Sequence, residues 1–393
     1  GSATGELYMT DSTIYLGDNQ SSHIGTVNRA DDSLSYMIHS CGDGNGYVSM
    51  TNSQILGVTT TAGNFNSRLY IGHVGEGTLV LNDSTVSNMT IFQIGTYLYR
   101  TLNTSQGMIS DVLGTGSGTV VLNGNSYVSI MPTTTSGVVQ DLVVGRGGSG
   151  TLIVNGGTLT TGGAIRIGEA GSETITISSG GSLTSSVLIL SSTGSLQQTG
   201  GSIYADSLYI AGRTLTATTG TVANGEMIVT GGVTTVNTLS VGAGNTLSSA
   251  TLNVASGGKV VVNQRFVVGN YATLSFTVKG NDFSQPLIDA SGIGGADIIL
   301  YTNGIYEIDL TGVTSTDADI TITLMAYDTR PSNYGNITFQ VDYDDTKYIF
   351  DADTDIIWDV DGLKVHLQYI PEPAMAGALM ALLALTLAAR RRK

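Results

Sequence analysis

The chain has 393 residues, of which 53 are glycine and 1 is cysteine, and its formal net charge is −15 at pH 7. The glycines follow no three-residue period, which excludes a collagen triple helix, and the lone Cys41 excludes an internal disulfide bond. The negative charge argues against nucleic acid and anionic membrane surfaces as partners. An apolar content of 41% is enough for a folded core.

A short apolar strand that ends in glycine or another small residue recurs along the first 270 residues. Its first and third positions are apolar in every copy, whereas the middle position varies. This alternation predicts that two side chains of each copy point into a core and one points outward. The nine copies begin at Ile14, Leu69, Phe92, Leu142, Ile165, Leu188, Leu208, Leu239 and Phe266.

Three consecutive copies give the sharpest expectation for which side chains are buried. The side chains expected to stack in two inward columns are Leu142, Val144, Ile165, Ile167, Leu188 and Leu190. The side chains expected on an outward, solvated face are Val143, Arg166 and Ile189.

Two further short strands and glycine-rich turns follow the recurring strand. The second strand has the form Gly-Thr-Leu-Val-Leu-Asn at Gly77–Asn82 and recurs with small changes at Gly118–Asn123 and Gly150–Asn155. Glycine pairs such as Gly156-Gly157 then precede a third strand, and glycine suits corners that need positive φ and close approach of the backbone. Three strands per unit with glycine corners predict an all-β, right-handed parallel β-helix (β-solenoid). The alternative is an array of antiparallel β-sandwiches.

The spacing of the copies gives the expected length of one coil. Gly145 and Gly168 lie 23 residues apart, so we expect about 23 residues per coil and about 11 or 12 coils. Two longer steps, 17 to 72 and 95 to 145, are interpreted as a degenerate coil plus loop insertions. The segments expected to hold the inserted loops are Asn19–Asn45, Thr96–Ser110 and Met131–Gln140.

The repeat resembles the β-helical repeats of autotransporter-type surface proteins, whose pattern is V-G-x-x-G-x-G-T-L-x-V-x-G-G. The clearest copy runs from Val144 to Gly157, and the resemblance covers about residues 60–270. It implies a passenger-like β-helix and specifies no activity.

The same segment contains a G-x-G-x-x-G sequence at Gly145–Gly150. Dinucleotide binding needs a helix that opens at the third glycine. Thr151–Asn155 is expected to be a strand, so we interpret these glycines as structural. The repeat carries no row of paired carboxylates, and the histidines lack the spacing of a metal site. The sequence therefore predicts a protein that is not an enzyme.

The composition changes near residue 280, which predicts a β-helix domain at 1–280 and an acidic, β-rich cap or sandwich-like domain at 281–370. The segment Asn281–Pro373 contains 17 acidic and 3 basic residues. Apolar and polar residues alternate there like half-buried antiparallel strands. The strands expected are Ile298–Tyr301, Tyr306–Leu310, Ile320–Leu324, Ile337–Val341 and Leu363–Leu367.

Three aspartates in the acidic segment form a candidate metal site. Asp351, Asp353 and Asp355 occupy alternate positions, as do carboxylates of loops that bind Ca²⁺. The glycine and glutamate that would complete an EF-hand loop are missing, because Ile356 and Gly362 occupy their positions. Calcium is therefore a candidate cofactor, and the alternative is an acidic turn exposed to solvent.

The C-terminal segment 371–393 consists of Pro371-Glu372-Pro373, the apolar run Ala374–Ala389, and Arg390-Arg391-Arg392-Lys393. A helix over the apolar run would cross a membrane with its basic end in the cytoplasm, so the upstream chain would face away from the cytosol. In this order the three parts resemble the PEP-CTERM sorting signal of Gram-negative, biofilm-forming bacteria. The resemblance implies recognition by an exosortase, a membrane enzyme that cleaves near the Pro-Glu-Pro motif.

These features together predict an exported structural or adhesive protein. We expect it to be anchored in the bacterial inner membrane by its C-terminal helix before processing, and then to reach the cell surface or the extracellular polymer. The alternative is a β-helix that binds or degrades polysaccharide. Outward tyrosines at 15, 70 and 209 could stack on sugars, and a groove with two carboxylates less than about 10 Å apart would favour this alternative.

Overall fold

The computed structural model describes residues 4–16, 21–24, 45–57, 67–73, 75–104, 107–131, 142–168, 172–191, 193–211, 224–242, 249–294, 297–314, 318–331, 334 and 337–370, with backbone only at 21–23 and 97–114. Its named elements are thirty β-strands, β1 to β30. The sorting motif, apolar run and basic end expected at 371–393 lie outside the described residues.

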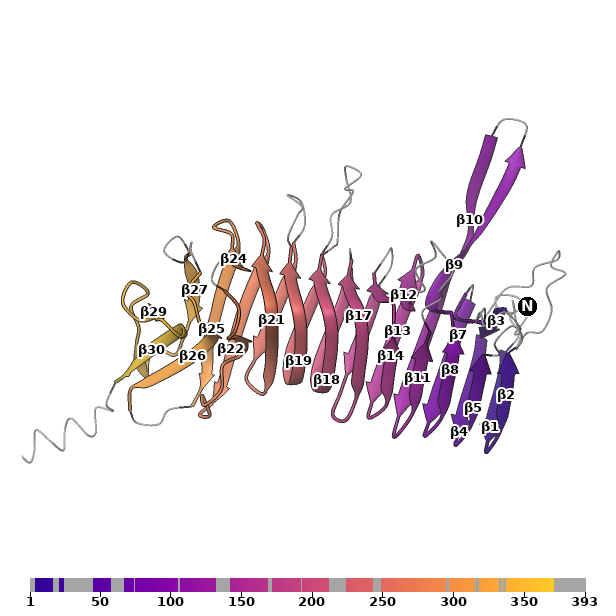
Figure 1. Cartoon of the computed structure of the whole chain (residues 1–393), viewed down its shortest axis with the longest axis horizontal. Helices are drawn as coiled ribbons and strands as arrows, with labels where there is room; N and C mark the ends of the chain where they lie inside the picture. Colours follow the sequence, from indigo (N-terminus) through magenta and orange to yellow (C-terminus); the bar gives the residue numbers. More distant parts are fainter. Residues whose placement is uncertain are drawn as a thin grey trace, which may run out of the picture.

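Twelve strands stack in parallel to form the first face of the molecule, which runs along its whole length (Figure 1). Each strand pairs with the next in a matching register, so that Gly118 lies beside both Gly77 and Gly150. The strands of the first face are β1 (Thr4–Thr10), β4 (Asn45–Thr51), β7 (Gly75–Asn82), β10 (Gly107–Asn123), β13 (Ser149–Asn155), β16 (Glu173–Ile177), β18 (Gly194–Ile210), β19 (Glu226–Val241), β20 (Thr251–Ala255), β22 (Thr273–Gly280), β25 (Ile305–Val313) and β27 (Phe339–Asp342).

Two further parallel stacks form the second and third faces. The second face contains β2 (Thr13–Leu16), β5 (Gln54–Gly57), β8 (Thr85–Met89), β11 (Tyr127–Ile130), β14 (Thr158–Thr161), β17 (Ser182–Leu190), β21 (Gly258–Val268), β23 (Ile288–Ala290) and β26 (Ile320–Tyr327). The third face contains β3 (Ser21–Ile24), β6 (Arg68–Ile71), β9 (Ile91–Thr104), β12 (Leu142–Arg146), β15 (Ala164–Ile167) and β24 (Ile298–Leu300). Four long strands bend around a corner and contribute to more than one face: β17, β18, β19 and β21.

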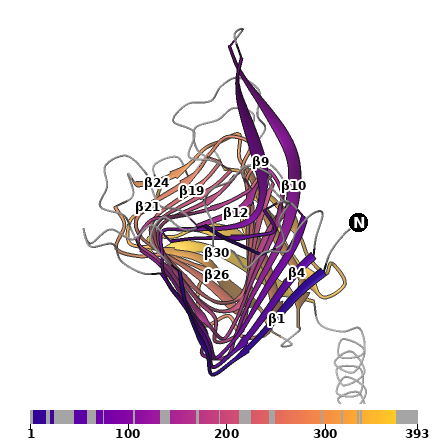
Figure 2. The ribbon, with the colours of Figure 1, turned by 90° about the vertical axis from the view of Figure 1, so that its right-hand side faces the viewer.

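The three stacks enclose one apolar core. Figure 2 looks along the stack, where the strands outline a three-sided cross-section. This arrangement is that of a β-solenoid, so the all-β, mostly parallel architecture predicted from the repeat is confirmed. All six side chains predicted to be inward are fully buried, namely Leu142, Val144, Ile165, Ile167, Leu188 and Leu190. They pair in the expected columns, since Leu142 lies beside Ile165 and Ile165 beside Leu188.

The prediction of a solvated outer side was wrong for two of the three outward residues. Arg166 is half-buried, but Val143 and Ile189 are only 5% and 4% exposed. A strand that is covered on both sides has apolar residues at every position, and the sequences Leu-Val-Val and Leu-Ile-Leu fit that rule. Alternation therefore identifies the inward side chains of these strands, but it does not show that their outer side is also covered.

The coils differ in length because residues are inserted at corners, and no degenerate coil is present where one was expected. One turn of the solenoid takes 41 residues from Asn82 to Asn123, but 23 from Asn155 to Ser178. Strand β9 pairs directly with β12, so the long step from 95 to 145 is a single coil. Its extra residues include an antiparallel hairpin formed by the end of β9 and the start of β10, which projects from the stack (Figure 1).

The first predicted copy of the recurring strand was placed on the wrong face. Ile14 lies in β2, which pairs with β5 on the second face. The strand that stacks on Leu69–Ile71 is instead Ser22–Ile24 in β3. Ser22 and His23 interrupt the apolar pattern, so the true copy was not recognised in the sequence.

Polar ladders stabilise the corner between the first and second faces. Asn123 donates a side-chain hydrogen bond to Asn82 at 3.0 Å, and Asn155 donates one to Asn123 at 3.4 Å. The backbone N–H of Ser84 donates to the hydroxyl of Ser126 in the next coil at 3.2 Å. At this corner each coil needs one residue with a left-handed backbone conformation. In two successive coils that residue is Asp83, at φ 48°, and Gly124, at φ 62°.

The parallel ladder continues beyond residue 280. Strands β22, β25 and β27 pair in parallel on the first face, and β23 and β26 do so on the second. All five strands expected in this segment coincide with or overlap observed strands, but the predicted antiparallel pairing is limited to the last one. Strand β30 (Gly362–Tyr369) runs antiparallel to β26 and to the short strands β28 (Tyr348–Ile349) and β29 (Ile356–Trp358). This small antiparallel sheet is defined here as the cap.

Candidate functional site

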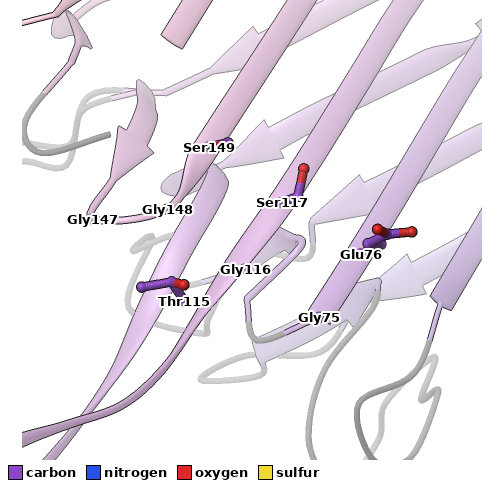
Figure 3. Close-up of a pocket in the computed structure, with 8 residues that line it drawn as sticks. All are labelled: Gly75, Glu76, Thr115, Gly116, Ser117, Gly147, Gly148 and Ser149. Carbon is purple, nitrogen blue, oxygen red and sulfur yellow. The ribbon is translucent and has the colours of Figure 1, made fainter. Parts of the chain in front are cut away.

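A cleft of about 330 Å³ crosses three coils at the corner between the third and first faces. It lies where β7, β10 and β13 begin their runs on the first face, beside the base of the β9–β10 hairpin. Figure 3 shows its lining residues, which are Gly75, Glu76, Thr115, Gly116, Ser117, Gly147, Gly148 and Ser149.

The register of the solenoid places three exposed polar side chains in a row across the cleft. Glu76 of β7 pairs with Ser117 of β10, and Ser117 pairs with Ser149 of β13. All three are exposed, and neighbouring strands in a sheet lie about 4.8 Å apart. The cleft therefore presents a carboxylate and two hydroxyl groups at the regular spacing of the coils.

Glycines give the cleft a floor of backbone. A Cβ added to Gly116 would lie 2.0 Å from the carbonyl oxygen of Gly72, and one added to Gly148 would lie 2.2 Å from the carbonyl oxygen of Gly116. No real Cβ tolerates such contacts with backbone, so only glycine permits this close approach of the coils. The hollow exists because these positions carry no side chains.

A histidine lies close behind the cleft floor. A Cβ on Gly116 would lie 2.9 Å from the backbone carbon of His73. The Nδ1 atom of His73 is 2.5 Å from the hydroxyl oxygen of the buried Thr96, and its ring lies 5.2 Å from that of Tyr70. These contacts hold the imidazole in place at the edge of the site.

The chemistry available in the cleft is hydrogen bonding. Glu76 is the one carboxylate among the described residues that line it. Hydrolysis of a glycosidic bond ordinarily requires two carboxyl groups that flank the bond. A carboxylate with two hydroxyls and exposed backbone can instead donate to and accept from a ligand rich in hydroxyl groups.

A buried glutamate lies one coil beyond the cleft. Glu173 opens β16, where it pairs with Gly150 of β13, and it is 2% exposed. Its Oε2 accepts a hydrogen bond from the hydroxyl of Thr193 at 2.8 Å, whereas its Oε1 has no hydrogen-bond partner among the described residues. Burial raises the pKa of Glu173 to about 7, and the hydrogen bond from Thr193 opposes that rise.

The three predicted calcium ligands lie in a turn between β28 and β29, where the carboxylates of Asp351 and Asp355 accept hydrogen bonds from the backbone of the same turn. Asp351 Oδ1 accepts from the N–H of Asp353 at 3.0 Å, and Asp355 Oδ2 accepts from the N–H of Asp351 at 2.7 Å. In the part of the chain that the structure describes, no three His, Cys, Asp or Glu residues are grouped so as to hold a metal ion. A calcium site at these aspartates therefore remains a prediction.

The glycine motif Gly145–Gly150 has the structural role expected from the sequence. It connects β12 to β13, and Gly145 and Gly147 have φ values of 78° and 81°. A strand follows it, as predicted, where a dinucleotide site would need a helix. Gly147, Gly148 and Ser149 of this motif also line the cleft.

Neither the cleft nor the buried glutamate was predicted from the sequence. The signal for the cleft is the alignment of Gly-Glu-Gly at 75–77, Gly-Ser-Gly at 116–118 and Gly-Ser-Gly at 148–150. The signal for Glu173 is that it occupies the position held by Gly77, Gly118 and Gly150 in the preceding coils. Both signals require the strands to be aligned coil by coil.

The three tyrosines predicted to point outward differ in exposure. Tyr15 is exposed, as expected, whereas Tyr70 and Tyr209 are half-buried.

Within the described ranges, no helix has the length and apolar character to cross a membrane. The sorting motif Pro371–Pro373 and the cations Arg390–Lys393 are outside those ranges.

Comparison with known proteins gives no relative from which a role could be transferred. No protein-family model, no curated protein and no solved structure matches this chain, so its function is inferred from its own residues and geometry.

Proposed function

We propose that this protein is a non-catalytic structural or adhesive component of the bacterial cell surface or extracellular matrix, built as a right-handed β-helix. The observation that carries this proposal is the unbroken parallel stack of twelve strands around one apolar core. Each coil satisfies the open backbone edge of its neighbour. Such a body is stiff along its axis and suits a spacer.

The outer side of the first face supports a role in contact rather than in catalysis. Thr78, Thr119, Thr151 and Thr174 pair in one outward, half-buried row along this face. A row of uncharged hydroxyl groups offers hydrogen bonds without strong charge, and it can contact a hydrated polymer along its length.

We further propose that the C-terminal segment directs export and processing. Its Pro371–Pro373 motif, apolar run and Arg390–Lys393 cluster support recognition by an exosortase at the inner membrane. Cleavage near the motif would release the solenoid to the cell surface or the extracellular polymer.

Mass spectrometry of the C-terminus of the protein purified from its native host tests this proposal. We expect a mature chain that ends near Pro371–Pro373, and an uncleaved chain when Arg390–Lys393 are replaced by neutral residues, because the positive cluster sets topology. Two results would contradict the sorting proposal. One is a mature chain that keeps residues 374–393; the other is loss of the tail at the same site and rate in the neutral variant.

Binding of polysaccharide is a second candidate function, and the cleft favours it. The row Glu76, Ser117 and Ser149 repeats at about 4.8 Å, the spacing of the coils. Side chains on one side of an extended peptide recur only every ~6.7 Å, so a peptide would fall out of step with the row. A pyranose unit of an extended glycan advances by a distance close to the coil spacing, and its hydroxyls match the donors and acceptors of the cleft.

Affinity electrophoresis in gels that contain a linear neutral glycan, or the extracellular polysaccharide of the host, tests this second function. Ser117→Tyr should fill the cleft and abolish retardation of the protein. Ser202→Tyr is the matched control, because Ser202 is exposed on the second face, where it pairs with Ser182, and lies outside both the cleft lining and the threonine row. Equal mobility of Ser117→Tyr, Ser202→Tyr and the wild type in all gels would exclude the cleft as the binding site.

A further inference from the structure

Glu173 interrupts a column of glycines at one corner of the solenoid. Successive coils have Gly77, Gly118 and Gly150 at this register position, and the coil after Glu173 has Gly194. A Cβ on Gly118 would lie 2.3 Å from the carbonyl oxygen of Ile71. The corner therefore has no room for a side chain in most coils, and the glutamate is an exception that needs a physical explanation.

The side chain of Glu173 is accommodated beneath the bend that begins at Gly145. A Cβ on Gly145 would lie 1.7 Å from the Cγ atom of Glu173 and 2.3 Å from its Oε1. Gly145 also has a φ of 78°, so its position is closed to other residues on two grounds. The carboxyl group thus lies against the backbone of the preceding coil.

In the part of the chain that the structure describes, no positive charge compensates the buried carboxyl group. The bend carries Arg146, which is exposed, and β15 carries Arg166, which is half-buried on the outer side. Neither contributes to the pKa of Glu173, which burial and the Thr193 hydroxyl determine. The two segments that pair with β16 contain no titratable residue; they are Gly150–Val154 and Gly194–Gln198.

We propose that Glu173 is a proton-operated latch, whose carboxyl group holds the Gly145–Ser149 bend closed when protonated and loosens it when ionised. Uncharged, the group fills the corner at little cost. Ionised, its Oε1 is a buried negative charge without a hydrogen-bond donor, which is strongly unfavourable. Entry of water beneath the bend relieves that cost, and the proton passes to solvent.

The latch acts on the cleft because the two share the bend. Gly147, Gly148 and Ser149 form one wall of the cleft, while Gly145 rests on Glu173. Loss of the proton therefore loosens one wall of the cleft. Glu76 and Ser117 keep their positions, because they lie on other coils. This conclusion holds whether or not the cleft binds a glycan.

The direction of the pH effect follows from the two protonation states. Glu173 has an ordinary pKa of 4.5 and a folded-state pKa raised to about 7. The folded state therefore holds its proton more tightly than the unfolded state, and this contribution to stability is complete below pH 4.5. It is lost as the pH rises from 4.5 through about 7, and no further change comes from this group above that range.

Chemical unfolding of the full chain, followed across pH 4 to 9, tests the latch against Glu173→Gln. The amide imitates the uncharged acid, so this variant should lose the fall in midpoint that the wild type shows between about pH 4.5 and 7. Glu173→Gly, which restores the residue of the neighbouring coils, should lose it as well. Glu226→Gln on β19 is the control and should keep the wild-type profile. A wild-type slope retained in both Glu173 variants would overturn the proposal.

Hydrogen exchange of the backbone amides at 145–150 gives the local measurement. The wild type is compared with Glu173→Gln at each pH. The intrinsic pH dependence of amide exchange is the same in both proteins, so it cancels in this comparison. We expect equal protection of the bend at acidic pH and weaker protection in the wild type above pH 7. Equal protection of the bend at every pH, with the slope in stability still present, would mean that Glu173 titrates without moving the bend.

Discussion

The solenoid stabilises its corners in two different ways on either side of residue 280. Before it, side chains of one coil bond to those of the next, as in the ladder Asn82, Asn123 and Asn155. Beyond it, aspartates bond within their own turns: Asp309 Oδ1 accepts from both the N–H and the hydroxyl of Thr311, at 3.0 and 2.6 Å. The first device couples coils, whereas the second fixes its own turn. Two aspartates beyond residue 280 also bond to a neighbouring coil: Asp289 pairs with Lys259 at 2.8 Å, and Asp328 accepts from the N–H of Gly292 at 2.9 Å.

The change of composition near residue 280 is not accompanied by a change of strand pairing. The acidic segment has the same parallel ladder as the neutral segment until β27. Its carboxylates are used in turns at Asp289, Asp309 and Asp344, each bonded to the Ser or Thr two residues later. Carboxylates of the acidic segment are thus used at the turns of a ladder that continues across residue 280.

The largest expected effect is the loss of the shared core. Ile167→Asp should lower the free energy of unfolding by about 4 kcal/mol, because it buries an unpaired charge. Val143→Asp should now be nearly as severe, since Val143 is 5% exposed. Thr151→Asp, on the half-buried outer side of β13, is the control and should cost far less. Denaturant unfolding measures the change in free energy of unfolding for all three variants. A small change for Val143→Asp would show that the residues covering Val143 can move aside to admit water.

A sharper test of the second region is the aromatic cluster beneath the cap. The ring of Trp358 lies 6.0 Å from those of Tyr334 and Phe339, and 6.4 Å from that of Tyr327. Trp358→Ala should cost roughly 2–3 kcal/mol, less than for a fully buried tryptophan. Ile357→Ala, on the exposed side of β29, should cost little. If calorimetry of Trp358→Ala showed no loss of stability, the cap would not be fastened through this cluster.

The two corner devices can be compared by single substitutions. Asn123→Ala removes two ladder hydrogen bonds and should cost about 1 kcal/mol, with faster hydrogen exchange in the coils on both sides. Asp309→Ala should cost a similar or smaller amount, with faster exchange only at the turn to Thr311. An Asp309→Ala effect that spread to β22 and β27 would erase the distinction between the two regions.

The smallest expected effect concerns calcium. Because the carboxylates of Asp351 and Asp355 already accept hydrogen bonds from the backbone of their own turn, cations should act on the acidic segment by diffuse screening. Sodium chloride should then raise the melting temperature as much as calcium chloride of equal ionic strength, in the wild type and in Asp353→Ala alike. A saturating rise at micromolar calcium, absent in Asp353→Ala, would instead demonstrate a site.

Features that repeat within one strand could be predicted from the sequence. Features that depend on how distant coils align could not. The inward columns through Leu142 and Ile165 follow from alternation within one strand, so they could be read directly. The position of Ser22–Ile24 on the third face could not, because polar residues break the apolar pattern there. The cleft and Glu173 depend on which residues of distant coils become neighbours, and unequal insertions hide that register in the sequence.

Parallel pairing across residue 280 is the claim on which the comparison of the two regions depends, and a designed disulfide tests it most directly. Thr273 of β22 lies beside Ile305 of β25 in the parallel register, and both point outward. Neighbouring strands bring such pairs within reach of a disulfide. In a Cys41→Ala background, Thr273→Cys with Ile305→Cys should cross-link on oxidation, whereas Thr273→Cys with Asp309→Cys should not. Cross-linking of the second pair alone would contradict the continuous parallel solenoid.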